Sequence, residues 1–176
     1  LGLSFFISQT AFAKDKLTLY CSVEIDVCEI LVQAFEKEKG IDVAMTRKSS
    51  GETFAQIKAE GSNPKGDVWF GGTGDPHLTA SQEGLTYEYK SIHFDDLLPA
   101  AQNQAINGNY QTVGIYVGAL GFGYNKDIIA SKGLPEPKSW ADLTDPVYKG
   151  EIQIANPNSS GTAYTTLATI LQIFGE

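Results

Sequence analysis

The feature that most constrains the fold is the alternation of extended and helical segments over the first hundred residues. Short β-prone runs at 17–20, 41–46 and 67–70 are each followed by a segment of helical character. This alternation predicts a parallel sheet with crossover helices, that is, an α/β fold. In such sheets ligands bind at the carboxyl ends of the strands. A binding site is therefore expected in the loops that follow the three strands.

Apolar spacing and capping residues predict the helices that link these strands. Apolar residues within 28–35 recur at the spacing of an amphipathic helix. Ser49 and Glu52 fit a capping box at the start of the second helix. For the third, we expect Asp75 to cap a helix at about 78–83.

In the middle of the chain, a long apolar stretch punctuated by glycines predicts extended chain. We expect it to leave a first lobe, residues 14–116, and to enter part of a second lobe, residues 117–176. In the second lobe we expect a strand at 150–155 and a final amphipathic helix ending near Phe174. The sequence thus predicts two α/β units.

The first thirteen residues have the character of a secretory leader. They carry no charge, are rich in Leu and Phe, and end in an Ala-x-Ala pattern just before Lys14. This pattern is typical of the apolar part and cleavage site of a signal peptide, so we expect an exported, periplasmic protein. The alternative is a buried N-terminal strand. No other stretch approaches the ~18 apolar residues that a membrane span needs.

Composition excludes several classes of function. Thirteen Lys and Arg against 21 Asp and Glu give a net charge of −8, which argues against nucleic acid as a partner. Hydrophobic residues make up 42% of the chain, too many for a disordered tail. Neither a Walker A motif nor a Gly-x-Ser-x-Gly elbow occurs, and we expect no enzymatic activity.

The cysteines and histidines leave one question open and answer another. Cys21 and Cys28 lie seven residues apart, and an oxidising compartment would allow a disulfide between them, although geometry could forbid it. The chain has two histidines and neither a CxxC nor an HxxxH motif, so we expect no metal site and no cofactor.

Two loops combine hydroxyl side chains with a glycine immediately before a predicted helix, at 49–51 and at 159–162. A helix start presents free N–H groups and a partial positive charge, and it can hold phosphate or carboxylate. The alternative is plain N-capping, which Ser provides in many helices. Two such loops on two predicted lobes favour an anion-binding cleft between them.

Several segments resemble periplasmic solute-binding proteins of bacterial ABC import systems, in the branch of ferric-ion, phosphonate and sugar-phosphate binders. The resemblance rests on residues 17–22, 49–53, 67–75, 140–150 and 156–164. It implies a type II periplasmic-binding-protein fold of two lobes, of which this chain resembles the first and part of the second. It also implies a monomer that passes a small anionic solute to a permease in the inner membrane.

The resemblance also bears on the ligand. Ferric-ion binders of this branch often have a His in the first strand–helix loop, and residues 20–24 contain none. We therefore expect a phosphorylated organic ligand such as a sugar phosphate or phosphonate, with its phosphate at 159–163. A ferric-ion binder is the alternative, and a secreted α/β hydrolase or transferase is a remote one. The ligand contacts expected from the loops and the resemblance are Ser22, Ser49, Ser50, Gly51, Gly72, Thr73, Asn156, Ser159, Ser160, Gly161, Thr162, Ala163 and Tyr164.

Overall fold

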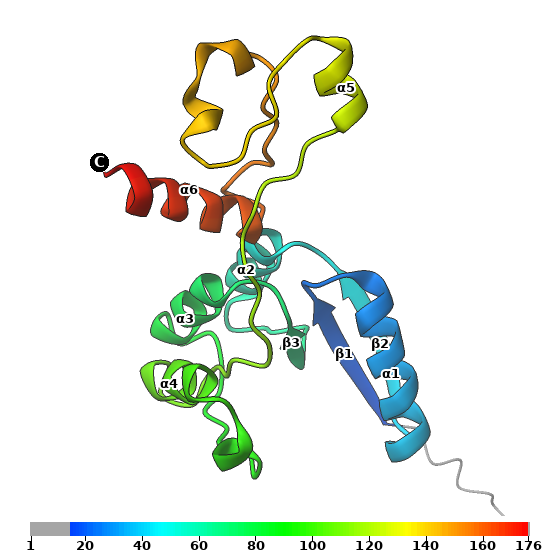
Figure 1. Ribbon diagram of the computed structural model, residues 1–176. Coiled ribbons are helices and arrows are strands. Elements are labelled where there is room, and N and C mark those ends of the chain that lie inside the picture. The colour runs from blue at the N-terminus through cyan, green and yellow to red at the C-terminus, as the bar shows by residue number, and fades with distance from the viewer. Residues whose placement is uncertain (1–14, 176) are drawn as a thin grey trace, which may run out of the picture.

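The computed structural model describes residues 15–175, so the predicted signal peptide lies outside the described residues. Its sheet consists of β1 (Lys16–Cys21), β2 (Asp42–Arg47) and β3 (Val68–Phe70). All pairs are parallel, in the order β2-β1-β3 (Figure 1). The parallel sheet predicted from the alternation of strands and helices is confirmed.

Crossover helices connect the strands. Helix α1 (Ile25–Lys39) leads from β1 to β2, and α2 (Ser50–Glu60) leads from β2 to β3. Helix α1 ends where Gly40 takes a φ of 70°, a left-handed conformation that Gly adopts without strain. The capping box predicted at the start of α2, with Glu52 as its acidic member, is present.

The third helix begins earlier than predicted. Helix α3 (Gly74–Gln82) starts with Thr73 as its N-cap, so the prediction that Asp75 caps a helix at 78–83 is wrong. Pro76 stands inside the first turn, where the missing N–H has no intrahelical acceptor to bind, so it does not delay the helix.

Helix α4 (Pro99–Asn107), preceded by the 3₁₀ turn η1 (Phe94–Asp96), completes the part of the molecule that contains the sheet. We call residues 15–111 the sheet part. Residues 112–125, the connecting segment, contain neither helix nor strand, as the glycine-punctuated sequence predicts.

Residues 126–175, which we call the distal part, lie at the top of Figure 1, with the last helix nearest to the sheet part. They form α5 (Lys126–Ser131), the 3₁₀ turns η2 (Asp142–Thr144) and η3 (Pro146–Tyr148), and α6 (Gly161–Phe174). The strand predicted at 150–155 is wrong. A strand is stabilised by ladder hydrogen bonds, and no described strand pairs with these exposed residues.

The two cysteines, whose pairing the sequence leaves open, are joined. Cys21 at the end of β1 and Cys28 in the first turns of α1 form a disulfide, and both are fully buried. The bridge ties together the two ends of the turn that follows β1. Among the described helices, none is long and apolar enough to cross a membrane.

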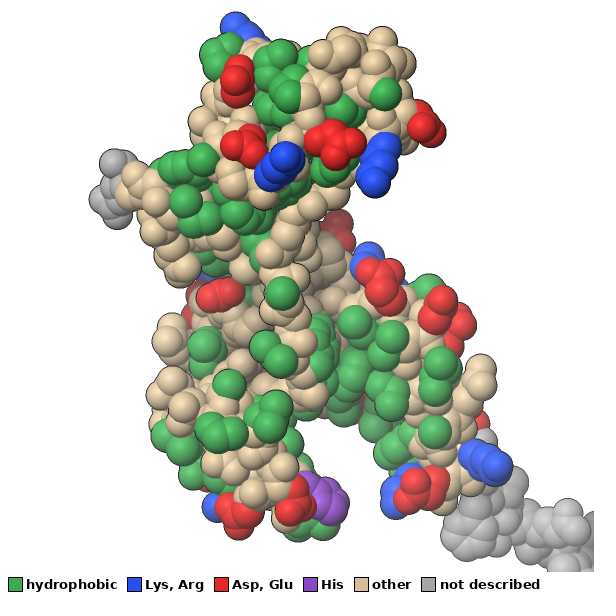
Figure 2. All heavy atoms as spheres, viewed as in Figure 1, with side chains coloured by type: hydrophobic (Ala, Val, Ile, Leu, Met, Phe, Trp, Pro, Cys, Tyr) green, Lys and Arg blue, Asp and Glu red, His purple; other side chains and the backbone are tan. Residues whose placement is uncertain are grey.

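The predicted apolar face of α6 is covered only at its start. Ala163 is buried, whereas Leu167, Leu171 and Phe174 remain almost half exposed. Figure 2 shows the hydrophobic side chains that gather over this helix. The end of α6 that points toward the sheet part is therefore the end that is packed.

Candidate anion-binding cleft

A cleft of about 510 Å³ lies at the carboxyl ends of the strands, where the sheet part meets the distal part. The sheet part supplies residues 22–24, 49–50 and 72–75 to its lining. The other wall comes from 116–120 of the connecting segment and from 160–162 at the start of α6. This is the position that a parallel sheet predicts for a ligand.

Three helices begin at this cleft. The N-cap residues are Ser49 for α2, Thr73 for α3 and Ser160 for α6. The Ser160 hydroxyl accepts a hydrogen bond from the N–H of Ala163 at 3.3 Å, so it caps its own helix. Each helix start carries a partial positive charge, and bringing three of them together favours an anion.

The three starts are in close contact. Ser50 Oγ accepts a hydrogen bond from the N–H of Thr73 at 3.2 Å, which joins α2 to α3. A Cβ atom on Gly161 would lie 2.5 Å from Thr73 Oγ1 and 2.8 Å from Ser50 Oγ, so glycine is what lets α6 approach both. Gly72 has a φ of 92°, and a Cβ there would also meet Ser50 Oγ.

Thr73 has a hydroxyl with no partner. Its Oγ1 is buried, and within residues 15–175 it is the one buried side-chain polar atom that makes no hydrogen bond. A buried hydroxyl without a partner costs about 1–3 kcal/mol. This oxygen lies where α3 and α6 begin, next to Gly161.

Eight predicted contact positions line the cleft: Ser22, Ser49, Ser50, Gly72, Thr73, Ser160, Gly161 and Thr162. The cleft lining does not include Gly51, Asn156, Ser159, Ala163 or Tyr164. Within this second group, the N–H of Gly51 donates to the carbonyl of Ser159 at 3.0 Å. A Cβ on Gly51 would lie 2.5 Å from the carbonyl oxygen of Asn158. The structure thus places Gly51 and Ser159 in a backbone contact between α2 and the loop before α6.

Two hydroxyls of the lining have partners inside the protein. Ser22 Oγ accepts from Trp69 Nε1 at 2.8 Å and lies 3.0 Å from Thr53 Oγ1, so it braces the floor of the cleft. Ser49 Oγ lies 2.8 Å from Glu52 Oε2 and 2.5 Å from Ser159 O, and its single hydrogen can be donated to only one of them. Hydrogen bonds from the Ser49 hydroxyl and N–H lower the pKa of Glu52.

Arg47 and Tyr116 are among the lining residues that are absent from the predicted contacts. Arg47, at the end of β2, donates from Nε to the carbonyl of Val23 at 3.3 Å. Tyr116 lies in the connecting segment with its hydroxyl on Gly72. Arg47 stands directly after the strand predicted at 41–46, a position from which the sequence could have indicated it as a site residue. Nothing local to Tyr116 marks it, since its partner is 44 residues away.

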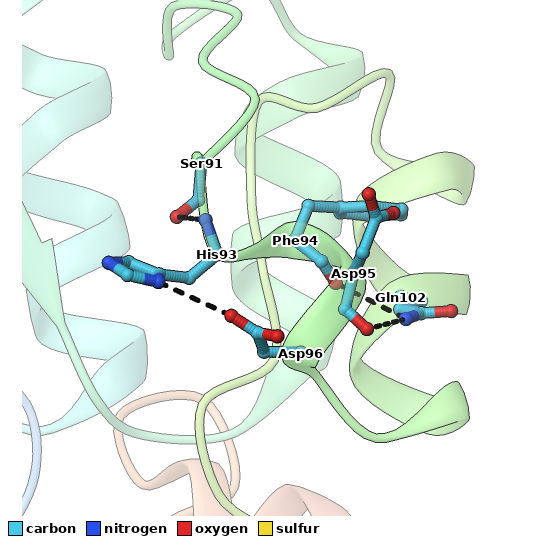
Figure 3. A network of polar contacts seen from close by, with 6 residues as sticks. All are labelled: Ser91, His93, Phe94, Asp95, Asp96 and Gln102. Carbon is cyan, nitrogen blue, oxygen red and sulfur yellow. Dashed lines mark hydrogen bonds and ion pairs between the residues drawn. The ribbon is translucent and has the colours of Figure 1, made fainter.

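Neither histidine lines the cleft. His77 stacks on Trp69 at 3.7 Å between ring centroids, and its Nε2 lies 2.8 Å from Gly71 O. His93 belongs to an exposed network at η1, where its Nδ1 lies 3.4 Å from Asp96 Oδ2 (Figure 3). In residues 15–175 no group of three or more His, Cys, Asp or Glu side chains is arranged to hold a metal ion.

A comparison with protein families places the chain. Residues 72–176 match the family model described as bacterial extracellular solute-binding protein. The chain belongs to this family. The resemblance to periplasmic solute-binding proteins is therefore confirmed, and the matched family is one of solute-binding proteins.

Two curated relatives are longer than this chain. An uncharacterized protein of Haemophilus influenzae is 45% identical over 177 residues, covering 100% of this chain and 51% of that protein. The phosphoglycerate transport regulatory protein PgtC of Salmonella typhimurium is 28% identical over 144 residues, covering 81% of this chain and 35% of that protein. The chain thus spans about half or less of the length of these relatives.

Solved structures agree on the fold. The periplasmic binding protein P5PA superposes with a TM-score of 0.87 at 40% identity, over 93% of this chain and 52% of that one. AfuA from Actinobacillus pleuropneumoniae, with exogenous fructose-6-phosphate bound, gives 0.86 at 43% identity with the same coverage. Iron-bound HitA from Pseudomonas aeruginosa gives 0.63 at 21% identity, a likeness of fold alone. The chain has the type II periplasmic binding fold, of which it covers part.

Proposed function

We propose that this protein is the solute-binding component of an ABC importer and that it captures a small phosphorylated organic solute, a sugar phosphate, in the cleft. The observation that carries the proposal is the contact of three helix starts around the buried, unpartnered hydroxyl of Thr73. Helix starts and hydroxyls bind phosphate without a dedicated cation. The fructose-6-phosphate bound in AfuA and the name of PgtC support the same ligand class.

The negative charge of the whole protein does not oppose this proposal. Backbone N–H groups act on a ligand within hydrogen-bond distance, whereas charges on the surface are screened over about 8 Å at physiological salt. Arg47 adds a cation to the cleft lining, and its guanidinium is held in place by Val23 O. Glu24 and Asp75 also line the cleft, so the N–H groups of the three helix starts, together with Arg47, are what would favour an anion there.

The proposal extends to the lobe boundary, the leader segment and the location of the protein. We infer that the lobes divide at residues 116 and 117, that residues 1–13 are removed on export, and that the protein acts as a periplasmic monomer beside its permease. Nucleic acid is not a proposed partner, because the net charge is −8.

The alternatives have less support from the site. Iron is bound in HitA, whose likeness to this chain is one of fold. A hydrolase needs a nucleophile next to a base. Neither histidine lines the cleft, and His77 directs Nε2 to Gly71 O.

The test is ligand binding by the protein encoded by the whole gene. Thermal shift and calorimetry would compare fructose 6-phosphate, 3-phosphoglycerate, a phosphonate and ferric citrate, with fructose as the control that lacks the phosphate. We expect a phosphate ester to raise the melting temperature and fructose to leave it unchanged. Ligand at 100 times its Kd adds about 2.7 kcal/mol of stability. Stabilisation by ferric salts alone, with a coloured complex, would contradict the proposal.

A further inference from the structure

The connecting segment contacts the cleft through one side chain. The Tyr116 hydroxyl accepts a hydrogen bond from the N–H of Gly72 at 2.8 Å and donates one to the carbonyl of Gly72 at 3.0 Å. One hydroxyl therefore occupies both backbone groups of a residue 44 positions away. The Tyr116 side chain is itself half exposed at the cleft, so this contact is not a by-product of burial in a core.

Gly72 is a residue whose conformation needs support. Gly71 and Gly72 have φ values of 81° and 92°, in the region that only glycine adopts without strain, and glycine is also the residue with most freedom to leave it. The carbonyl of Gly71 is held by His77 at 2.8 Å, and Gly72 is held by Tyr116. Two ring side chains thus hold the turn between β3 and α3 from two directions.

The conformation of this turn sets the position of the next residue. Thr73 is the N-cap of α3 and carries the buried hydroxyl without a partner. A rotation about Gly72 would move the Thr73 N–H away from Ser50 Oγ and Thr73 Oγ1 away from Gly161. The Tyr116 hydroxyl opposes that rotation without any need to touch the ligand.

We propose that Tyr116 is a positioning residue for the anion site, holding Gly72 so that Thr73 Oγ1 and the first turn of α3 face the phosphate of the ligand. This inference rests on the proposed function. It adds that the affinity for the ligand depends on the Tyr116 hydroxyl of the connecting segment. Tyr116 acts on the affinity by positioning Thr73.

The experiment is a double-mutant cycle on the protein encoded by the whole gene, with fructose 6-phosphate as the probe in calorimetry. Tyr116→Phe keeps the ring and removes both hydrogen bonds, and we expect binding about tenfold weaker. Thr73→Val removes the hydroxyl that Tyr116 positions. In the double variant we expect binding within about twofold of Thr73→Val alone, because coupled residues are not additive.

Tyr148→Phe is the matched control. It removes another tyrosine–backbone hydrogen bond, from Tyr148 Oη to Pro135 O at 2.6 Å, in the distal part and away from the cleft lining. We expect Tyr148→Phe to lower the melting temperature and to leave the affinity unchanged. Tyr116→Phe would give the same result if Tyr116 had a merely structural role. Unchanged affinity in Tyr116→Phe, or losses that multiply in the double variant, would overturn the inference while the proposed function stands. Failure of the wild-type protein to bind any phosphate ester would overturn both.

Discussion

The two walls of the cleft are built differently. The wall from the sheet part is tied down by strand ladders, by the disulfide and by buried side chains such as Ser50 and Thr53. The distal wall is the start of α6. The later apolar side chains of this helix are almost half exposed, and no described strand belongs to the distal part. The sheet part therefore defines the geometry of the site, while the distal part adds one helix start to it.

The largest effect is expected from the disulfide. Replacing Cys21 and Cys28 together by Ala should lower the free energy of unfolding by about 2–3 kcal/mol, because a short closed loop no longer limits the unfolded chain. Denaturant unfolding of the oxidised wild type and of the double variant measures this difference in the free energy of unfolding. The double variant in reductant controls for any effect of the reductant itself. An unchanged unfolding midpoint would mean that the bridge does not stabilise the sheet-part wall.

Gly161→Ala tests the contact between the walls. Its methyl group would lie 2.5 Å from Thr73 Oγ1 and 2.8 Å from Ser50 Oγ, so α6 has to move away from the other two helix starts. We expect fructose 6-phosphate to bind at least about tenfold more weakly, since such overpacking costs about 1–3 kcal/mol. Gly121→Ala, where a Cβ meets nothing within 4 Å, is the control. Equal affinities in the two variants would contradict the contact.

Thr73→Val separates binding from stability on the sheet-part wall. It removes a buried hydroxyl without a partner, so the free protein should become about 1 kcal/mol more stable. Binding of fructose 6-phosphate should nevertheless weaken, because a ligand bond is lost. The control is Thr79→Val, in the same helix, whose hydroxyl donates to Asp75 O at 3.0 Å. If Thr73→Val lost stability as well as affinity, the hydroxyl would have a partner within the free protein.

The smallest effect concerns pH. Burial lowers the pKa of His77 below its ordinary value of 6.5, and the hydrogen bond with Gly71 O opposes this in part. Well above pH 6.5 the imidazole is neutral in both the folded and the unfolded chain, so protonation of His77 does not reduce the stability there. As the pH falls below 6.5 the unfolded chain takes up the proton first, so stability falls until the folded-state pKa is reached. The slope from this one group stays below about 1.4 kcal/mol per pH unit.

Melting temperatures between pH 7.5 and 5 measure this effect. We expect His77→Gln to show a shallower fall than the wild type, and His93→Gln, which changes the exposed histidine at η1, to follow the wild type. A steeper fall in His77→Gln would reverse the sign assigned to the burial of His77.

Local patterns made much of the sheet part predictable. The alternation that gives β1 to β3, and the pairing of Ser49 with Glu52, depend on residues close in sequence. The serines and glycines of the loops were identified as site residues for the same reason. Helix α4 was not predicted, although Pro99 at its first position is a usual start signal.

Contacts between distant segments could not be predicted in this way. Two such contacts are the hydrogen bond from Gly51 to Ser159 and the hydrogen bonds between Tyr116 and Gly72. They form only when distant segments pack together, and no residue nearby in the sequence indicates them. The strand predicted at 150–155 failed for a related reason. Alternating polar and apolar residues show that a segment can pair as a strand, whereas pairing depends on a partner strand elsewhere in the chain.

The burial of both cysteines has a practical consequence for handling the protein. Neither sulfur is reached by solvent in the folded state, so a thiol reagent or reductant can act only on molecules that have opened around the first turn of α1. The rate at which a reductant cleaves the disulfide in native buffer therefore measures how often this turn opens. For the same reason, an oxidant can form the bridge only before the two cysteines are packed or when this turn opens.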